Sequence, residues 1–68
     1  MVRIVVRIIP GNVVREIETR NGCVYEVLKK LGYSRESVVV LYKGEPILEN
    51  TCLEDGEMVE IYVATSGG

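Results

Sequence analysis

Apolar and polar residues alternate along the first third of the chain, which is the pattern of β-strands with one buried face. In VRIVVRII, residues 2–9, the residues expected on the buried face are Val2, Ile4, Val6 and Ile8. The composition PGN at residues 10–12 predicts a turn. In VVREIET, residues 13–19, the residues expected to point inwards are Val13, Ile17 and Thr19, although Arg15 interrupts the pattern. Two such strands joined by a short turn predict an antiparallel hairpin.

The hydrophobic period then changes to that of a helix, between Asn21 and Ser34. Apolar residues recur at positions i, i+3, i+4 and i+7, and these residues are Val24, Val27, Leu28 and Leu31. Gly32 follows them and is suited to ending a helix in the left-handed conformation. Because a helix of about two to three turns is not stable alone in water, we expect it to pack across a sheet.

Three further strands are expected after the helix. In SVVVLYKGEPIL, alternation places one set of side chains inwards, namely Val38, Val40 and Tyr42, and the opposite set outwards, namely Val39 and Leu41. The sequence KGEP, residues 43–46, predicts a turn into a short strand at residues 47–48. Residues 49–57 read as a loop in which Leu53 is the one residue expected to be buried. In the last strand, MVEIYVA, the inward residues are expected to be Val59, Ile61 and Val63.

The composition agrees with a sheet-rich single domain. The 68 residues include twelve Val and six Ile against five Leu, with no Trp, Phe or His. Branching at Cβ suits the pleated surface of a sheet, so this apolar content favours strands. The predicted order β-β-α-β-β-β therefore indicates an α+β roll, with one helix packed across a mixed sheet.

Charge and residue content exclude several functions. Eight basic and ten acidic residues are interspersed and give a net charge of -2, so we expect no direct binding to nucleic acid. No stretch approaches the ~18 consecutive apolar residues of a membrane span, and no signal peptide is recognisable, so a cytoplasmic location is expected. Without His, and without a nucleophile with its base, neither a metal site nor a catalytic site is expected.

The element order and three motifs resemble the ubiquitin-like β-grasp family over the whole chain. VVVLYKGEPI is similar to the family's V-x-V-x-x-N/D-G-x-x-V hairpin, and GCVYEVLKKLG is similar to its helix entry. LEDGEMVEIYVATSGG is similar to L-x-D-G-D-x-V-E-I-x-x-x-x-x-G-G. The members most similar in size are the sulfur carriers ThiS and MoaD, the ubiquitin-related modifier and the small archaeal modifiers. The resemblance implies a ubiquitin-like β-grasp domain over residues 1–64 and a flexible tail over residues 65–68.

The resemblance also implies a role for Gly67 and Gly68. In such proteins an E1-like enzyme uses ATP to adenylate the terminal carboxylate, which a sulfur donor converts to a thiocarboxylate or which is conjugated to a lysine amine. Glycines allow close backbone approach to a nucleotide, and Ala64, Thr65 and Ser66 keep the tail slim. The chain would then be a carrier rather than an enzyme, with no permanently bound cofactor. The resemblance divides into three types. The first hairpin, residues 2–19, is longer than is typical of the ThiS type, which serves thiamine synthesis, and the chain is shorter than most of the MoaD type, which serves molybdopterin synthesis, and lacks their N-terminal aromatic segment. These departures favour the archaeal modifier type, which serves tRNA thiolation and lysine conjugation.

A docking patch for the activating enzyme is expected beside this tail. Alternation places Leu41 and Tyr62 on the outward face of adjacent strands, and Val39 joins them there. Together with Thr65 and Ser66 they would form the partner-binding surface that the resemblance implies. The alternative is that a loop covers these apolar side chains.

Three interpretations of Cys23 and Cys52 stay open. In a β-grasp fold the loop that carries Cys52 passes near the start of the helix, so the resemblance implies that the two sulfurs can form a disulfide. The other interpretations are two small buried hydrophobic residues, or a redox-active thiol on Cys23 whose thiolate the helix dipole would favour.

Lysines and partners complete the expectations. The three lysines, Lys29, Lys30 and Lys43, are read either as solvated surface residues or as acceptors of another copy's Gly68.

The resemblance implies that the chain is a monomeric carrier. Its expected partners are the E1-like enzyme, a sulfur donor or sulfurtransferase, and acceptor lysines of other proteins. The alternative function is a β-grasp interaction module that is never conjugated, which predicts that deleting Gly67 and Gly68 leaves partner binding intact.

Overall fold

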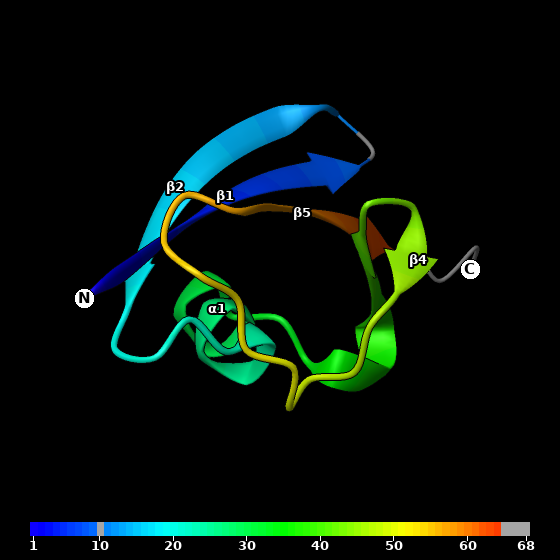
Figure 1. The fold of residues 1–68 in the computed structure, drawn as a ribbon. Coiled ribbons are helices and arrows are strands. Elements are labelled where there is room, and N and C mark those ends of the chain that lie inside the picture. Colours follow the sequence, from blue (N-terminus) through cyan, green and yellow to red (C-terminus); the bar gives the residue numbers. More distant parts are fainter. Residues whose placement is uncertain (10, 65–68) are drawn as a thin grey trace.

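The computed structural model describes residues 1–9 and 11–64, and Figure 1 shows their arrangement. The elements, in chain order, are β1 (Val2–Ile9), β2 (Val13–Thr19), α1 (Val24–Leu31), a 3₁₀ turn η1 (Arg35–Ser37), β3 (Val38–Tyr42), β4 (Glu45–Pro46) and β5 (Met58–Val63). The strands form one mixed sheet in the order β2-β1-β5-β3-β4, in which β1 and β5 are parallel and the other pairs are antiparallel. The predicted α+β order and the single helix are therefore confirmed.

The core lies between α1 and the inner face of the curved sheet, which arches over the helix (Figure 1). Its buried residues are Ile4, Val6, Ile8, Val24, Val27, Leu28, Val40, Leu53, Val59 and Ile61. Partly buried residues, including Val2, Ile17 and Leu31, pack around them. The alternation and the helical period predicted most of this set, because each buried face follows the period of its own element.

The prediction that Val13 points into the core is wrong, since this residue is 49% exposed. Val13 pairs with Ile8 near the hairpin turn, whereas Thr19, at the other end of β2, is only 1% exposed. The chain passes from Thr19 almost directly into α1, so the helix covers that end of the hairpin and not the turn end (Figure 1).

The short strand predicted at residues 47–48 is displaced by two residues, to Glu45–Pro46. Lys43 and Gly44 both have positive φ values, 52° and 84°, so they form a two-residue hairpin turn. Tyr42 therefore faces Glu45 directly, and pairing begins at once. The chain then leaves the sheet, and Leu48 is 73% exposed.

Backbone hydrogen bonds to the loop between β4 and β5 fix the start of α1. The N–H groups of Val24 and Tyr25 donate to the carbonyl oxygens of Thr51 and Glu49, both at 2.9 Å. These two N–H groups belong to the first helical turn, which lacks partners within the helix. The loop therefore caps α1 from outside. Among the described residues no helix has the length and apolarity needed to cross a bilayer.

Candidate functional site

Val39 and Tyr62 are direct cross-strand partners on β3 and β5. Their side chains are 51% and 39% exposed, whereas the next pair, Val40 and Ile61, is buried beneath α1. Because side chains alternate across a strand, Val39 and Tyr62 lie on the outer face of the sheet. Leu41 is half-buried and follows Val39 on the same face. The structure thus brings together the three residues expected from the sequence, and we refer to Val39, Leu41 and Tyr62 as the outer patch.

Two further apolar residues extend the outer patch, and neither was predicted from the sequence to belong to it. Ile9 on β1 is the register partner of Tyr62, and Met58, 42% exposed, lies four residues before Tyr62 on the same face of β5. The alternation of side chains along each strand already indicated that both residues point outwards. Only the parallel pairing of β1 with β5, however, places Ile9 next to Tyr62.

An ion pair interrupts the apolar surface. Arg7 and Glu60 are register partners on β1 and β5, and their side chains approach to 3.5 Å. Glu60 is also the cross-strand neighbour of Leu41. The outer patch is therefore bordered by one cation and one anion that partly neutralise each other.

The end of the described chain lies close to the outer patch. Val63, at the end of β5, pairs with Val38, and the N–H of Ala64 donates to the carbonyl oxygen of Ser37 at 2.8 Å. The chain thus leaves the sheet one residue away from Val39. The residues predicted to extend the docking surface, Thr65 and Ser66, and those predicted to form the reactive end, Gly67 and Gly68, lie outside the described residues.

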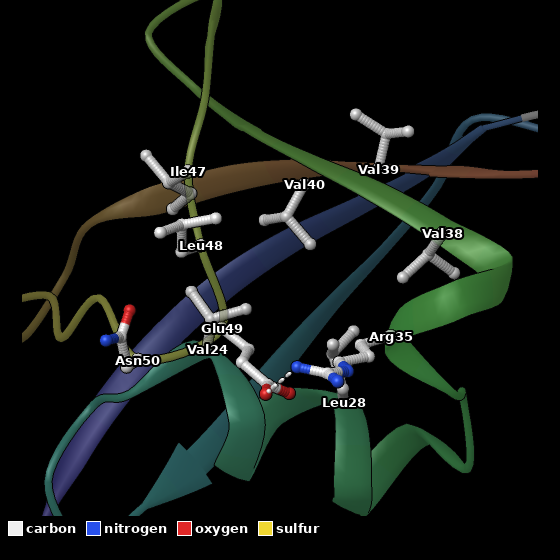
Figure 2. A pocket seen from close by; sticks show the side chains of 10 residues that line it. All are labelled: Val24, Leu28, Arg35, Val38, Val39, Val40, Ile47, Leu48, Glu49 and Asn50. Carbon is white, nitrogen blue, oxygen red and sulfur yellow. Dashed lines mark hydrogen bonds and ion pairs between the residues drawn. The ribbon is translucent and has the colours of Figure 1, made fainter.

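A groove of about 400 Å³ lies on the other side of β3, between this strand, α1 and the segment 47–50 (Figure 2). Its lining is mostly aliphatic and includes Val24, Leu28, Val38, Val40, Ile47 and Leu48. Figure 2 shows Arg35 and Glu49 facing each other beside it, with 2.7 Å between the guanidinium nitrogen and the carboxylate oxygen. Val39 also lines this groove, so the groove and the outer patch share one residue.

The two cysteines are joined in a disulfide between residues 23 and 52. Cys23 immediately precedes α1 and is 4% exposed, while Cys52 is exposed on the loop. Beside the bond, the N–H of Leu53 donates to the carbonyl oxygen of Gly22 at 2.8 Å. Of the three interpretations left open by the sequence, the structure therefore contains the disulfide.

Glu26 organises the turn that precedes α1. Its carboxylate accepts hydrogen bonds from the backbone N–H groups of Arg20, Asn21 and Cys23, at 3.1 to 3.4 Å. The bond from Cys23 is the main reason why the pKa of Glu26 lies below its usual value, with the bonds from Asn21 and Arg20 adding to it. Glu26 thus stabilises the turn before α1, a structural role that was not predicted from the sequence.

The three lysines occupy two separate places. Lys29 and Lys30 are exposed in the last turn of α1. Lys43 lies in the β3–β4 turn, with its ammonium 5.3 Å from the ring centre of Tyr42. The Tyr42 hydroxyl donates to the carboxylate of Glu57, which raises the pKa of Tyr42 and lowers the pKa of Glu57. All three ammonium groups are accessible, as both interpretations of these residues require.

Within residues 1–9 and 11–64, no three His, Cys, Asp or Glu side chains gather where they could hold a metal ion. The arrangement described above offers an exposed apolar patch, a groove and a covalently fixed loop.

No protein-family model matches this sequence. The ubiquitin of Caldiarchaeum subterraneum is similar in structure, with a TM-score of 0.71 and 19% sequence identity over 98% of both chains. The N-terminal ubiquitin-like domain of the 4931431F19Rik protein has a TM-score of 0.69 and 19% identity over 98% of this chain and 78% of its own. At this level of identity the comparison concerns the fold. The chain has the ubiquitin-like β-grasp fold, as the sequence predicted.

Proposed function

We propose that this chain is a ubiquitin-like sulfur carrier or protein modifier that is activated at Gly68. The observation that carries the proposal is the position of the outer patch, because β5 ends at Val63, whose register partner Val38 adjoins Val39, and only a few residues separate Val63 from Gly67 and Gly68 in the sequence. A partner that covers Val39 and Tyr62 would therefore receive the tail as well. The likeness in fold to the ubiquitin of Caldiarchaeum subterraneum supports the same assignment.

The chemistry follows from the carboxylate of Gly68. An E1-like partner would join it to the α-phosphate of ATP, releasing pyrophosphate and leaving an acyl-adenylate. Hydrosulfide delivered by a sulfur donor would then displace AMP and leave a thiocarboxylate. Alternatively, an enzyme thiol would displace AMP to give a thioester, and a lysine amine would take the acyl group from it in an isopeptide bond and release the thiol. In this proposal the chain works in the cytoplasm as a monomeric substrate and supplies no catalytic group. Its partners are the activating enzyme, a sulfur donor or sulfurtransferase, and acceptor lysines.

Intact mass spectrometry of the protein purified from its native host, without a C-terminal tag, tests the proposal. Replacement of one oxygen by sulfur, localised to Gly68 by fragmentation, is the result expected of a sulfur carrier. Peptides of other proteins that carry a Ser-Gly-Gly branch on lysine are the result expected of a modifier. Fragmentation is essential because oxidation of Met1 or Met58 changes the mass by nearly the same amount. A native chain that continues unprocessed beyond Gly68, or one that shows neither product, would contradict the proposal.

Variants separate the outer patch from the tail. Val39→Ser combined with Tyr62→Ser should leave the fold intact, since both side chains are exposed, and should weaken activation by the E1-like enzyme of the same genome. Val14→Ser is a matched control, because Val14 is 58% exposed on β2, two strands away from β5. Pyrophosphate exchange with labelled ATP measures the activation. Equal activity of the patch variant and the control would exclude the outer patch as the docking surface.

The alternative function is an interaction module that is never conjugated. The groove beside β3 favours it, because a mostly aliphatic hollow of about 400 Å³ lies within the size range of ligand sites. Deletion of Gly67 and Gly68 distinguishes the two functions. It abolishes activation of a carrier, and it leaves the partner binding of an interaction module unchanged.

A further inference from the structure

The two ends of the Cys23–Cys52 disulfide differ in their access to solvent. Cys23 is 4% exposed at the start of α1, whereas Cys52 belongs to the exposed part of the loop. A thiolate that attacks a disulfide must reach one of the two sulfurs. Packing around Cys23 blocks that sulfur, so exchange has to begin at Cys52.

The loop is held against α1 by more than the sulfur bond. Three backbone hydrogen bonds connect it to the residues around Cys23: Val24 N–H to Thr51, Tyr25 N–H to Glu49, and Leu53 N–H to Gly22. They flank Cys52 on both sides, at 2.8 to 2.9 Å. A break in the disulfide therefore leaves the Cys23 sulfur next to Cys52, at a high effective concentration.

The surroundings of Cys23 also make it a poor leaving group. The dipole of α1 would favour a thiolate there, but the first two N–H groups of the helix are already bonded to the carbonyl oxygens of Thr51 and Glu49. The Glu26 carboxylate accepts the backbone N–H of Cys23 itself, at 3.1 Å, and places a negative charge nearby. Burial removes the water that would solvate the thiolate.

We propose that the Cys23–Cys52 disulfide is a clasp that reseals itself after attack by a monothiol and that only a dithiol opens. A monothiol RS⁻ would attack Cys52 Sγ and form a Cys52–S–SR bond, while the bonding electron pair goes to Cys23 Sγ. The Cys23 thiolate, held in place, would then attack Cys52 Sγ, re-form the original bond and expel RS⁻. With a dithiol, the second thiol of the reagent attacks its own bound sulfur, releases the Cys52 thiolate and leaves as a cyclic disulfide.

The clasp protects one wall of the groove beside β3. The segment from Leu48 to Asn50 lines that groove and lies between the β3–β4 hairpin and Cys52. In a cytoplasm whose main thiol is a monothiol such as glutathione, the disulfide stays closed and this wall keeps its position. The shape of the groove therefore does not change with the concentration of glutathione. This inference is independent of any chemistry at Gly68.

Exchange measured on the oxidised full-length chain tests the clasp. The protein is incubated with glutathione or with dithiothreitol at equal thiol concentration, quenched with acid, treated with N-ethylmaleimide and weighed by intact mass spectrometry. We expect the glutathione sample to keep its disulfide and the dithiothreitol sample to carry two maleimide groups. If more than about half of the chain carries glutathione or two free thiols after the glutathione treatment, the proposal is wrong.

Two single variants test the asymmetry between the sulfurs. In Cys23→Ala the remaining Cys52 should react with oxidised glutathione at least about tenfold faster than the remaining Cys23 does in Cys52→Ala. Circular dichroism at low temperature establishes that both variants are folded. Equal rates in folded variants would overturn the proposal. If either variant does not fold, the comparison of the two reductants on the wild-type chain decides the question alone.

Discussion

Removal of the disulfide has an effect whose size follows from its position in the chain. The sequence separation of Cys23 and Cys52 is 29 residues. The chain-entropy relation for closing a loop of this length gives a denatured-state entropy loss of about 12 cal/mol/K, or about 3.6 kcal/mol at 25 °C. A domain of 68 residues is stable by only about 3.4 to 10 kcal/mol. The Cys23→Ala/Cys52→Ala variant should therefore lose between a third and all of its stability.

Guanidinium unfolding, followed by circular dichroism, measures this loss. The unfolding entropy of a domain of 68 residues is roughly 0.14 kcal/mol/K, so the same loss corresponds to a fall of about 25 °C in Tm. Wild-type protein that is fully reduced with dithiothreitol serves as the control, because it removes the cross-link without changing the side chains. A loss below about 1 kcal/mol in both samples would refute the reasoning, since it would mean that the cross-link barely constrains the unfolded chain.

Three further predictions concern other parts of the fold. Gly22→Ala should destabilise the protein clearly more than Gly44→Ala when both are measured by chemical unfolding. Both glycines have positive φ values, so both substitutions strain the backbone. In addition, a Cβ on Gly22 would collide with the Leu53 carbonyl oxygen, whereas one on Gly44 would meet open space. Equal losses would show that the Gly22 contact relaxes freely. Ile61→Ala should cost about 2–5 kcal/mol, because its side chain is fully buried, whereas Tyr62→Ala on the adjacent exposed position should cost far less. The hydrogen bond from Tyr42 lowers the pKa of Glu57 in the folded protein, so this bond contributes stability above pH 4.5 that is lost as the pH falls through the folded pKa. Tyr42→Phe should move the pKa of Glu57 back towards 4.5 in an NMR titration. An unchanged pKa would show that the Tyr42 bond is not its cause.

The fold was largely readable from the sequence because each element carries its own hydrophobic period. Val40, Val59 and Ile61 were predicted as core residues from alternation alone, and they are buried. The wrong assignment of Val13 has a different origin, since alternation gives the face of a strand and not the length over which a helix covers it. The strand β4 was predicted two residues too late because a two-residue turn requires a positive φ at Lys43. Such a φ is rare for a residue with a side chain, so the sequence favoured a longer turn.

The candidate site was predictable in part, for the same physical reason. Alternation placed Val39, Leu41 and Tyr62 on one face, and the structure shows them on neighbouring strands. The addition of Ile9 required the pairing of β1 with β5, which are separated by most of the chain. The groove could not be found from the sequence, because it depends on the path of residues 47–50 after they leave the sheet, which no periodic pattern specifies.

The parallel pairing of β1 with β5 also has a consequence for the synthesis of the protein. These two strands occupy the middle of the sheet, yet one comes first and the other nearly last in the described chain. A nascent chain that has not reached Met58 cannot join the β1–β2 hairpin to the β3–β4 hairpin. Such long-range pairing slows folding, because the entropy of closing the loop is lost before the contacts form. Folding should therefore wait until β5 has left the ribosome, and a prematurely terminated chain should stay unfolded and open to proteolysis.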